Sequence, residues 1–143
     1  MSNYVVVVAD AARARIFSRT KKFSPLQEET VLTHPESRLQ RQDLVSDRAG
    51  TVHESRTHGE NQAEEPTDPK RHEAESFARE VANHLHQRRH NGGLEGITLV
   101  AEPRFLGLLR SALDEATKKL VILEVRASLT RENAESIQSR IDA

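Results

Sequence analysis

The sequence predicts a single α/β domain with three layers, in which helices pack on a five-stranded mixed sheet. Three observations support this fold class. Short runs rich in valine, isoleucine and leucine recur along the chain, as they do in buried strands. After residue 69 the apolar residues adopt the spacing of amphipathic helices. A chain of 143 residues is long enough for one domain with a sizeable core.

Three strands are predicted before the first helix. The apolar run at residues 4–9 is continuous rather than alternating, which is typical of a central strand covered on both faces. The turn Asp10-Ala11-Ala12 leads into a second strand that ends at Phe17, with polar and apolar residues alternating. A third strand is predicted at residues 26–33 and would pair antiparallel with the second.

Helices and strands alternate in the second half of the chain. Pro69 suits the first turn of a helix capped by Asp68, and this helix is expected to end before Asn91-Gly92-Gly93. A strand follows at residues 97–101. One helix is then predicted over residues 103–119, a strand at 120–125, and a last helix capped by Thr130. The apolar stripes of these two helices are Phe105, Leu106, Leu109, Leu113 and Ala116 in one, and Ile137 and Ile141 in the other.

The predicted order of elements is β-β-β-α-β-α-β-α. Strands joined through a helix return parallel and by a right-handed route, so the expected spatial order of the strands is 3-2-1-4-5. This is the topology of the ribonuclease H-like group. Ligands of such sheets tend to gather at the ends of the central strands.

A long polar segment, residues 35–68, interrupts this domain of residues 1–143. Loops beyond about 12 to 15 residues without secondary structure are uncommon in compact domains and are usually binding loops or disordered. We therefore expect the function here. The segment holds eight acidic residues against four arginines, so it repels phosphate unless its two halves separate in space.

Composition excludes several classes of site. The chain has no cysteine, which excludes disulfides, thiolate metal sites and a cysteine nucleophile. With 21 basic and 22 acidic residues the net charge is −1, so binding to nucleic acid or to a membrane surface would need a local patch. No cofactor motif and no firm metal site is predicted. The N-terminal residues lack the features of a signal peptide, so the expected location is the cytoplasm.

Carboxylates at the predicted strand ends allow two readings. Asp10 follows the first strand, Glu102 follows the fourth, and Glu73 lies near the start of the first helix. Clustered carboxylates of this kind support two-metal phosphoryl chemistry, which would make the protein a hydrolase. The alternative is structural, because Asp in a turn accepts hydrogen bonds from backbone N–H groups and Glu102 stands where a helix begins.

Arginines form the most suggestive group for binding. They would create an anion-binding face for RNA phosphate, or they would form salt bridges that hold the long segment on the domain. The predicted partner-binding residues are Arg13, Arg15, Arg38, Arg41, Asp43, Asp47, Arg48 and Arg104. Gly107, inside a predicted helix, costs about 1 kcal/mol relative to Ala. This cost indicates close approach of another backbone or of a ligand, and we expect core packing to be the cause.

Several stretches of the sequence form a recognisable set of motifs. They are Val7-Val8-Ala9-Asp10-Ala11-Ala12-Arg13-Ala14-Arg15-Ile16-Phe17, Leu32-Thr33-His34-Pro35-Glu36-Ser37-Arg38, Asp43-Leu44-Val45-Ser46-Asp47-Arg48-Ala49-Gly50, Phe77-Ala78-Arg79-Glu80, Pro103-Arg104-Phe105-Leu106-Gly107-Leu108-Leu109-Arg110 and Leu129-Thr130. In these stretches, which run in order along nearly the whole chain, the sequence resembles the bacterial family of proteins required for attachment to host cells. The resemblance implies a part in attaching the bacterium to its host.

The order of elements is also similar to the middle domain of archaeal and eukaryotic class-one release factors. In that domain the loop before the first helix carries a Gly-Gly-Gln tip that enters the peptidyl-transferase centre. Residues 35–68 occupy this slot but contain no Gly-Gly-Gln. The resemblance leaves ribosome or RNA contact as an expectation. The leading hypothesis is a non-catalytic binding module with a protein or ribosome/RNA partner, and the alternative is a metal-dependent phosphodiester or peptidyl-tRNA hydrolase.

Overall fold

Five strands form one mixed sheet in the spatial order β3-β2-β1-β4-β5, which confirms the predicted fold class and strand order. The computed structural model describes residues 3–34 and 69–143. Its elements are β1 (Tyr4–Ala9), β2 (Arg13–Arg19), β3 (Gln27–Thr33), α3 (Pro69–His90), β4 (Gly96–Ala101), α4 (Pro103–Ala112), α5 (Glu115–Lys118), β5 (Val121–Arg126) and α6 (Ala134–Ile141).

β1 is the central strand, as its continuous apolar sequence predicts. It pairs antiparallel with β2 and parallel with β4, so that Val8 lies opposite both Arg15 and Val100. Residues 5–9 are all buried. β3 and β5 are the edge strands, and most of their residues keep contact with solvent.

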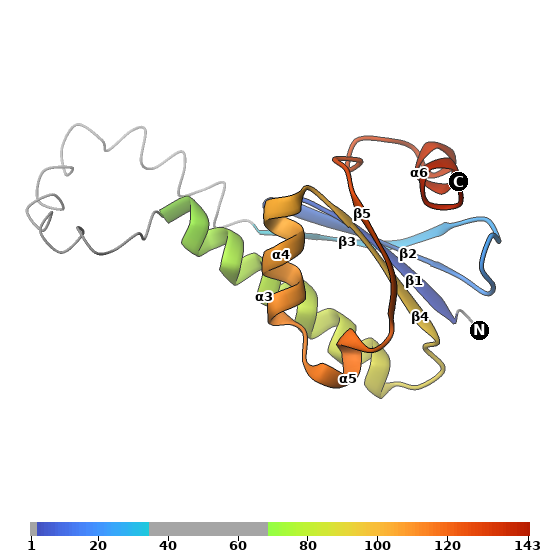
Figure 1. Ribbon diagram of the computed structural model, residues 1–143, viewed down its shortest axis with the longest axis horizontal. Coiled ribbons are helices and arrows are strands. Elements are labelled where there is room, and N and C mark those ends of the chain that lie inside the picture. The colour runs from blue at the N-terminus through green and yellow to red at the C-terminus, as the bar shows by residue number, and fades with distance from the viewer. Residues whose placement is uncertain (1–2, 35–68) are drawn as a thin grey trace, which may run out of the picture.

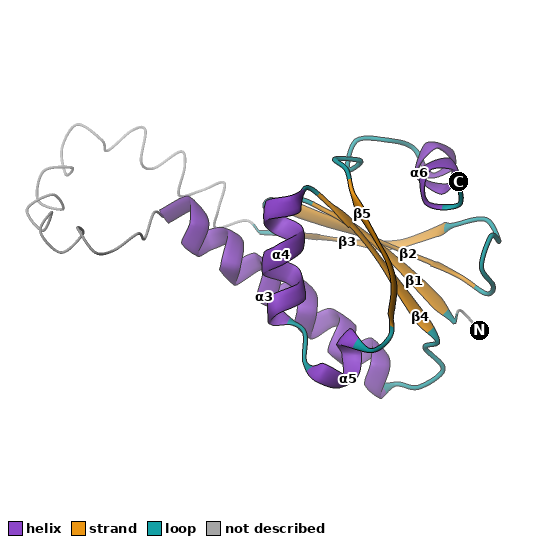
Figure 2. Cartoon of the chain, viewed as in Figure 1, coloured by secondary structure: helices purple, strands orange, loops and turns teal. Residues whose placement is uncertain are grey.

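Helices cover the sheet on both faces, as Figures 1 and 2 show. Alternate residues of β1 supply the two cores, because successive side chains of a strand point to opposite faces. Val5 and Val7 pack in the larger core with Phe77 of α3 and Leu106 of α4. Val6 and Val8 pack in the smaller core with Phe17, Val100, Ile137 and Ile141, the last two from α6.

An ion pair fastens α6 to the sheet. The two terminal nitrogens of Arg19, on β2, donate to the two carboxylate oxygens of Asp142 at 2.9 and 3.0 Å. The Arg19 side chain is only 6% exposed, so the pair is largely removed from water. A bidentate arginine–carboxylate pair fixes orientation as well as distance.

The region predicted as one helix over residues 103–119 is two helices. α4 ends at Ala112, the backbone of the following residue Leu113 is extended, and Asp114 then caps α5. The Asp114 Oδ1 accepts a hydrogen bond from the Thr117 backbone N–H at 2.8 Å. Aspartate competes for backbone N–H groups in this way, and the cap therefore interrupts an otherwise helical apolar pattern. Ala116, predicted to lie on the apolar stripe, is exposed.

The cap of the last helix is Asn133 rather than Thr130. The Asn133 side chain accepts a hydrogen bond from the Ser136 backbone N–H at 2.8 Å. Thr130 lies before the helix, is buried, and donates its hydroxyl hydrogen bond to Asp10 at 3.0 Å. The stop predicted for α3 is confirmed, since Gly92 and Gly93 follow His90 with positive φ angles of 88° and 81°.

Candidate functional site

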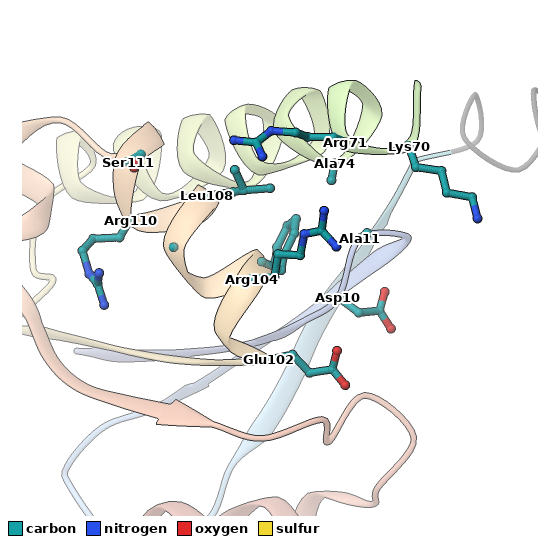
Figure 3. A pocket seen from close by; sticks show the side chains of 12 residues that line it. Asp10, Ala11, Lys70, Arg71, Ala74, Glu102, Arg104, Leu108, Arg110 and Ser111 are labelled. Atoms are coloured by element: carbon teal, nitrogen blue, oxygen red, sulfur yellow. The ribbon is translucent and has the colours of Figure 1, made fainter. Parts of the chain in front are cut away.

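A cavity of about 600 Å³ opens between α3, α4 and the turn after β1. Its size falls in the range of small-molecule sites. We call it the α3–α4 pocket and define it by six of its lining residues, Asp10, Arg71, Glu102, Arg104, Gly107 and Leu108. Figure 3 shows that α3 and α4 supply its helical walls.

The parallel register of β1 and β4 brings Asp10 and Glu102 to the same edge of the sheet. Val8 is paired with Val100, and Asp10 and Glu102 each follow two residues later. Both residues line the pocket, and their carboxylates lie on the same side of it in Figure 3. Glu73, the third residue of the predicted hydrolase site, lies on α3 but is not among the lining residues. In the described ranges, no group of three His, Cys, Asp or Glu residues is arranged to hold a metal ion.

Both carboxylate oxygens of Asp10 are engaged in the fold. Oδ1 accepts hydrogen bonds from the backbone N–H groups of Ala12 and Arg13, at 2.8 and 2.9 Å. Oδ2 accepts from the Thr130 hydroxyl at 3.0 Å. The geometry therefore favours the structural reading of Asp10, in which the side chain closes the turn before β2 and fastens it to the segment before α6.

Arg13 and Arg15 converge on the same segment. Arg15 donates to the carbonyl oxygens of Thr130 and Glu132, at 3.0 and 2.6 Å, and Arg13 reaches Thr130 O at 3.5 Å. Arg15 also forms a two-point ion pair with Glu28. This pair lowers the pKa of the Glu28 carboxyl below its ordinary value, mainly through the hydrogen bond from Arg15. Arg13 and Arg15, which the sequence predicted to bind a partner, thus form their hydrogen bonds within the domain.

Arg104 differs from the other arginines near the pocket. Arg110 pairs with Glu124, with an Nε to Oε2 distance of 3.0 Å, and Arg71 pairs with Glu75 at 3.1 Å. Arg104 is exposed and makes no hydrogen bond or ion pair with any residue that the structure describes. In Figure 3 its guanidinium lies between the Arg71 side chain above it and the Asp10 and Glu102 carboxylates below it.

Gly107 faces open space. A Cβ atom built there would meet nothing within 4 Å among the described residues. The expectation that core packing requires this glycine is therefore wrong. The helix bears the propensity cost of about 1 kcal/mol without a steric reason from the described part of the chain.

The remaining predicted partner-binding residues lie outside the described residues. They are Arg38, Arg41, Asp43, Asp47 and Arg48, all within residues 35–68. On either side of these residues, β3 ends at Thr33, opposite Arg13, and α3 begins at Pro69. Lys70, in the first turn of α3, lines the α3–α4 pocket. Thr33 and Lys70 therefore both lie at the edge of the sheet where the pocket opens.

Sequence reasoning singled out Asp10, Glu102, Arg104 and Gly107 but did not identify the other lining residues of the pocket, although a signal was present. Gly107 and Leu108 stand three and four residues after Arg104, and Ser111 follows them at the same spacing. Arg71 and Ala74 are three residues apart on the neighbouring helix. This spacing places each set on one helical face. The face on α4 lies beside the expected apolar stripe and carries a glycine and a charged residue instead.

A shallower groove lies between β3 and α3. Thr33, Glu80, His84 and Gln87 are among its lining residues, and its volume is about 410 Å³. Burial lowers the pKa of the His84 imidazole below its ordinary value, the Arg88 charge lowers the pKa further, and Glu29 raises it. His86 of α3 accepts a hydrogen bond from the Asp114 backbone N–H at 3.0 Å and so links α3 to α5.

A family model described as "Protein required for attachment to host cells" matches residues 5–141. Among solved structures, one described as "Archaeal protein" is similar at 13% sequence identity with a TM-score of 0.46. The match covers 97% of this chain and 36% of the archaeal chain, so this chain spans about a third of that protein. A comparison with curated proteins finds no match. Neither matching description mentions a release factor, so that similarity stays a prediction. No helix in the described ranges has the length and apolar character needed to cross a membrane.

Proposed function

The chain belongs to the family of proteins required for attachment to host cells, and from this premise we propose that it serves attachment as a non-catalytic binding module. Its effect on attachment is indirect, through a protein partner in the cytoplasm. The partner contacts residues 35–68 together with Arg104 beside the α3–α4 pocket. Cell fractionation tests the location.

One observation carries this proposal. The described residues that flank residues 35–68, Thr33 at the end of β3 and Pro69 at the start of α3, lie at the edge of the sheet where the pocket opens. An arginine without a partner among the described residues, Arg104, stands at the same edge. A partner that binds residues 35–68 beside these flanking residues would also reach the pocket.

The charge balance supports a protein over RNA as the partner. Residues 35–68 carry twice as many acidic residues as arginines. Around the pocket, Glu75 and Glu124 pair with Arg71 and Arg110, and Asp10 and Glu102 add two further carboxylates. RNA binding depends on many cations contacting phosphates and is strongly weakened by salt. A surface of mixed charge instead suits a protein of complementary charge pattern.

The test replaces Arg38, Arg41 and Arg48 together by Gln and measures recovery of partners from cells with the tagged chain. We expect a partner protein recovered with the unaltered chain to be lost, while circular dichroism and the melting temperature stay unchanged. The matched control replaces three exposed arginines of the described part, Arg126, Arg131 and Arg140, and changes the net charge equally. Unchanged recovery with the first variant contradicts the proposal. If the chain sediments with ribosomes and added salt releases it, the partner is the ribosome rather than a separate protein.

A hydrolase remains the second candidate because Asp10 and Glu102 both line the pocket. The hydrogen bonds that Asp10 accepts through both oxygens count against it. Calorimetric titration with Mn²⁺ separates the two functions. Saturable binding that Glu102→Gln removes would favour the hydrolase, and its absence would favour the binding module.

A further inference from the structure

We infer that the α3–α4 pocket binds a small organic anion, with one phosphate or carboxylate group at Arg104 and a flat apolar body against Gly107 and Leu108. This inference goes beyond the proposed function, because a small ligand can bind whether or not a macromolecular partner does. Three features of the pocket lead to it, and each concerns a different part of the ligand.

Gly107 indicates where the apolar body lies. The described residues leave open space where a side chain at this position would project. A glycine inside a helix weakens it, and here no packing contact within the described chain compensates. Phe105, Ala74 and Leu108 line the same cavity and give it an apolar wall. A flat molecule lying on this wall would use the space that any larger residue at position 107 would fill.

Arg104 indicates the anionic group. It is exposed and lacks a hydrogen-bond or ion-pair partner among the described residues, whereas Arg71 and Arg110 beside it are paired with carboxylates. A guanidinium group presents parallel N–H donors that match the two oxygens of a carboxylate or phosphate. The inference does not depend on whether Lys70 or Arg71 contributes further donors.

The remaining charges around the pocket limit how many negative charges the ligand carries. The pocket is lined by Lys70, Arg71, Arg104 and Arg110, and also by Asp10 and Glu102. Glu75 and Glu124 add two carboxylates next to the paired arginines. Four cations and four carboxylates leave no net positive field, so a polyanion gains little here. A single anionic group next to one unpaired arginine fits this balance.

The test titrates the full chain, labelled with ¹⁵N, with phenyl phosphate and benzoate. Inorganic phosphate and phenol serve as the anion alone and the apolar body alone. We expect saturable shifts of the Gly107 and Leu108 amide signals with phenyl phosphate, benzoate or both, and weaker binding of either part alone. The stronger of the two whole probes identifies the anionic group.

Two variants and one control separate the features. Arg104→Gln should weaken binding about tenfold or more, as expected when a charged hydrogen-bond partner is lost. Gly107→Ala should also weaken binding, yet raise the melting temperature by about 2–4 °C because Ala favours the helix. Arg140→Gln removes an exposed arginine from α6, on the other face of the sheet, and should change neither quantity.

Four outcomes would overturn the inference. One is the absence of saturable shifts up to about 10 mM of either whole probe, a concentration that would reveal even millimolar binding. A second is equal affinity of the Arg104→Gln and Arg140→Gln variants. A third is inorganic phosphate binding as tightly as phenyl phosphate, which would leave no role for the apolar wall. The fourth is a lower melting temperature of Gly107→Ala, which would mean that this chain itself needs the space.

Discussion

Thr130 is the residue on which the N-terminal motif converges. Asp10 accepts a hydrogen bond from the Thr130 hydroxyl, and Arg15 donates to its carbonyl oxygen. Thr130 is buried, so these bonds form away from bulk water. Residues far apart in the sequence, in Asp10-Ala11-Ala12-Arg13 and Leu129-Thr130, therefore form one structural cluster that joins the first turn to the segment before α6.

Asp10 gives a prediction at this scale. The Asp10→Ala variant leaves the N–H groups of Ala12 and Arg13 and the Thr130 hydroxyl without their acceptor. We expect the free energy of unfolding to fall by about 1–3 kcal/mol, the usual cost of unpaired polar groups away from water. Urea unfolding measures it. Glu102→Gln is the control, because Glu102 is exposed and makes no side-chain cap bond. Equal stability of the two variants would show that Asp10 is free for another role.

At the scale of elements, caps decide where helices begin. Apolar periodicity located every helix in the described ranges except the break between α4 and α5. It did not identify which of two polar residues caps the last helix. Thr130 and Asn133 both suit a cap by residue type. The choice falls on Asn133 because Thr130 is held by Asp10 and Arg15, which lie in distant parts of the sequence.

The Asn133→Ala variant tests this assignment. It should lower the free energy of unfolding by about 1 kcal/mol, since the Ser136 N–H loses its cap. Amide exchange in α6 should accelerate more than exchange in α4, which the change does not touch. Ser136→Ala is a suitable control, because the Ser136 backbone N–H and its bond to Asn133 are kept. If α6 exchanges at its original rate in Asn133→Ala, the cap is not what holds the start of the helix.

For the whole molecule, pH acts on stability first through histidine. The folded state lowers the pKa of His84 below the ordinary value of 6.5, mainly by burial. The unfolded chain therefore binds protons at His84 more readily than the folded chain. The contribution of neutral His84 to the free energy of unfolding is complete above pH 6.5 and is lost as the pH falls below that value. The pKa values of Glu28, Asp114 and Glu124 are also lowered, but these carboxyls act below pH 4.5 because their ordinary values are 3.8 to 4.5.

We expect the free energy of unfolding to decrease as the pH falls through the range below 6.5. The His84→Gln variant should decrease less over the same interval. Urea titrations at several pH values measure both slopes. His90→Gln, at the exposed end of the same helix, is the control. A His84→Gln slope as steep as that of the unaltered chain would assign the pH dependence to other groups.

The sequence by itself determined the sheet, its strand order and the apolar faces of its helices. These depend on local periodicity, which burial of one face imposes on nearby residues. The tertiary structure decided the roles of the polar residues. It bound Arg13 and Arg15 to the segment before α6, used both oxygens of Asp10, left Arg104 without a described partner and left open space beside Gly107. A polar side chain acts through the specific atoms near it, and in a folded chain many of those atoms come from distant parts of the sequence.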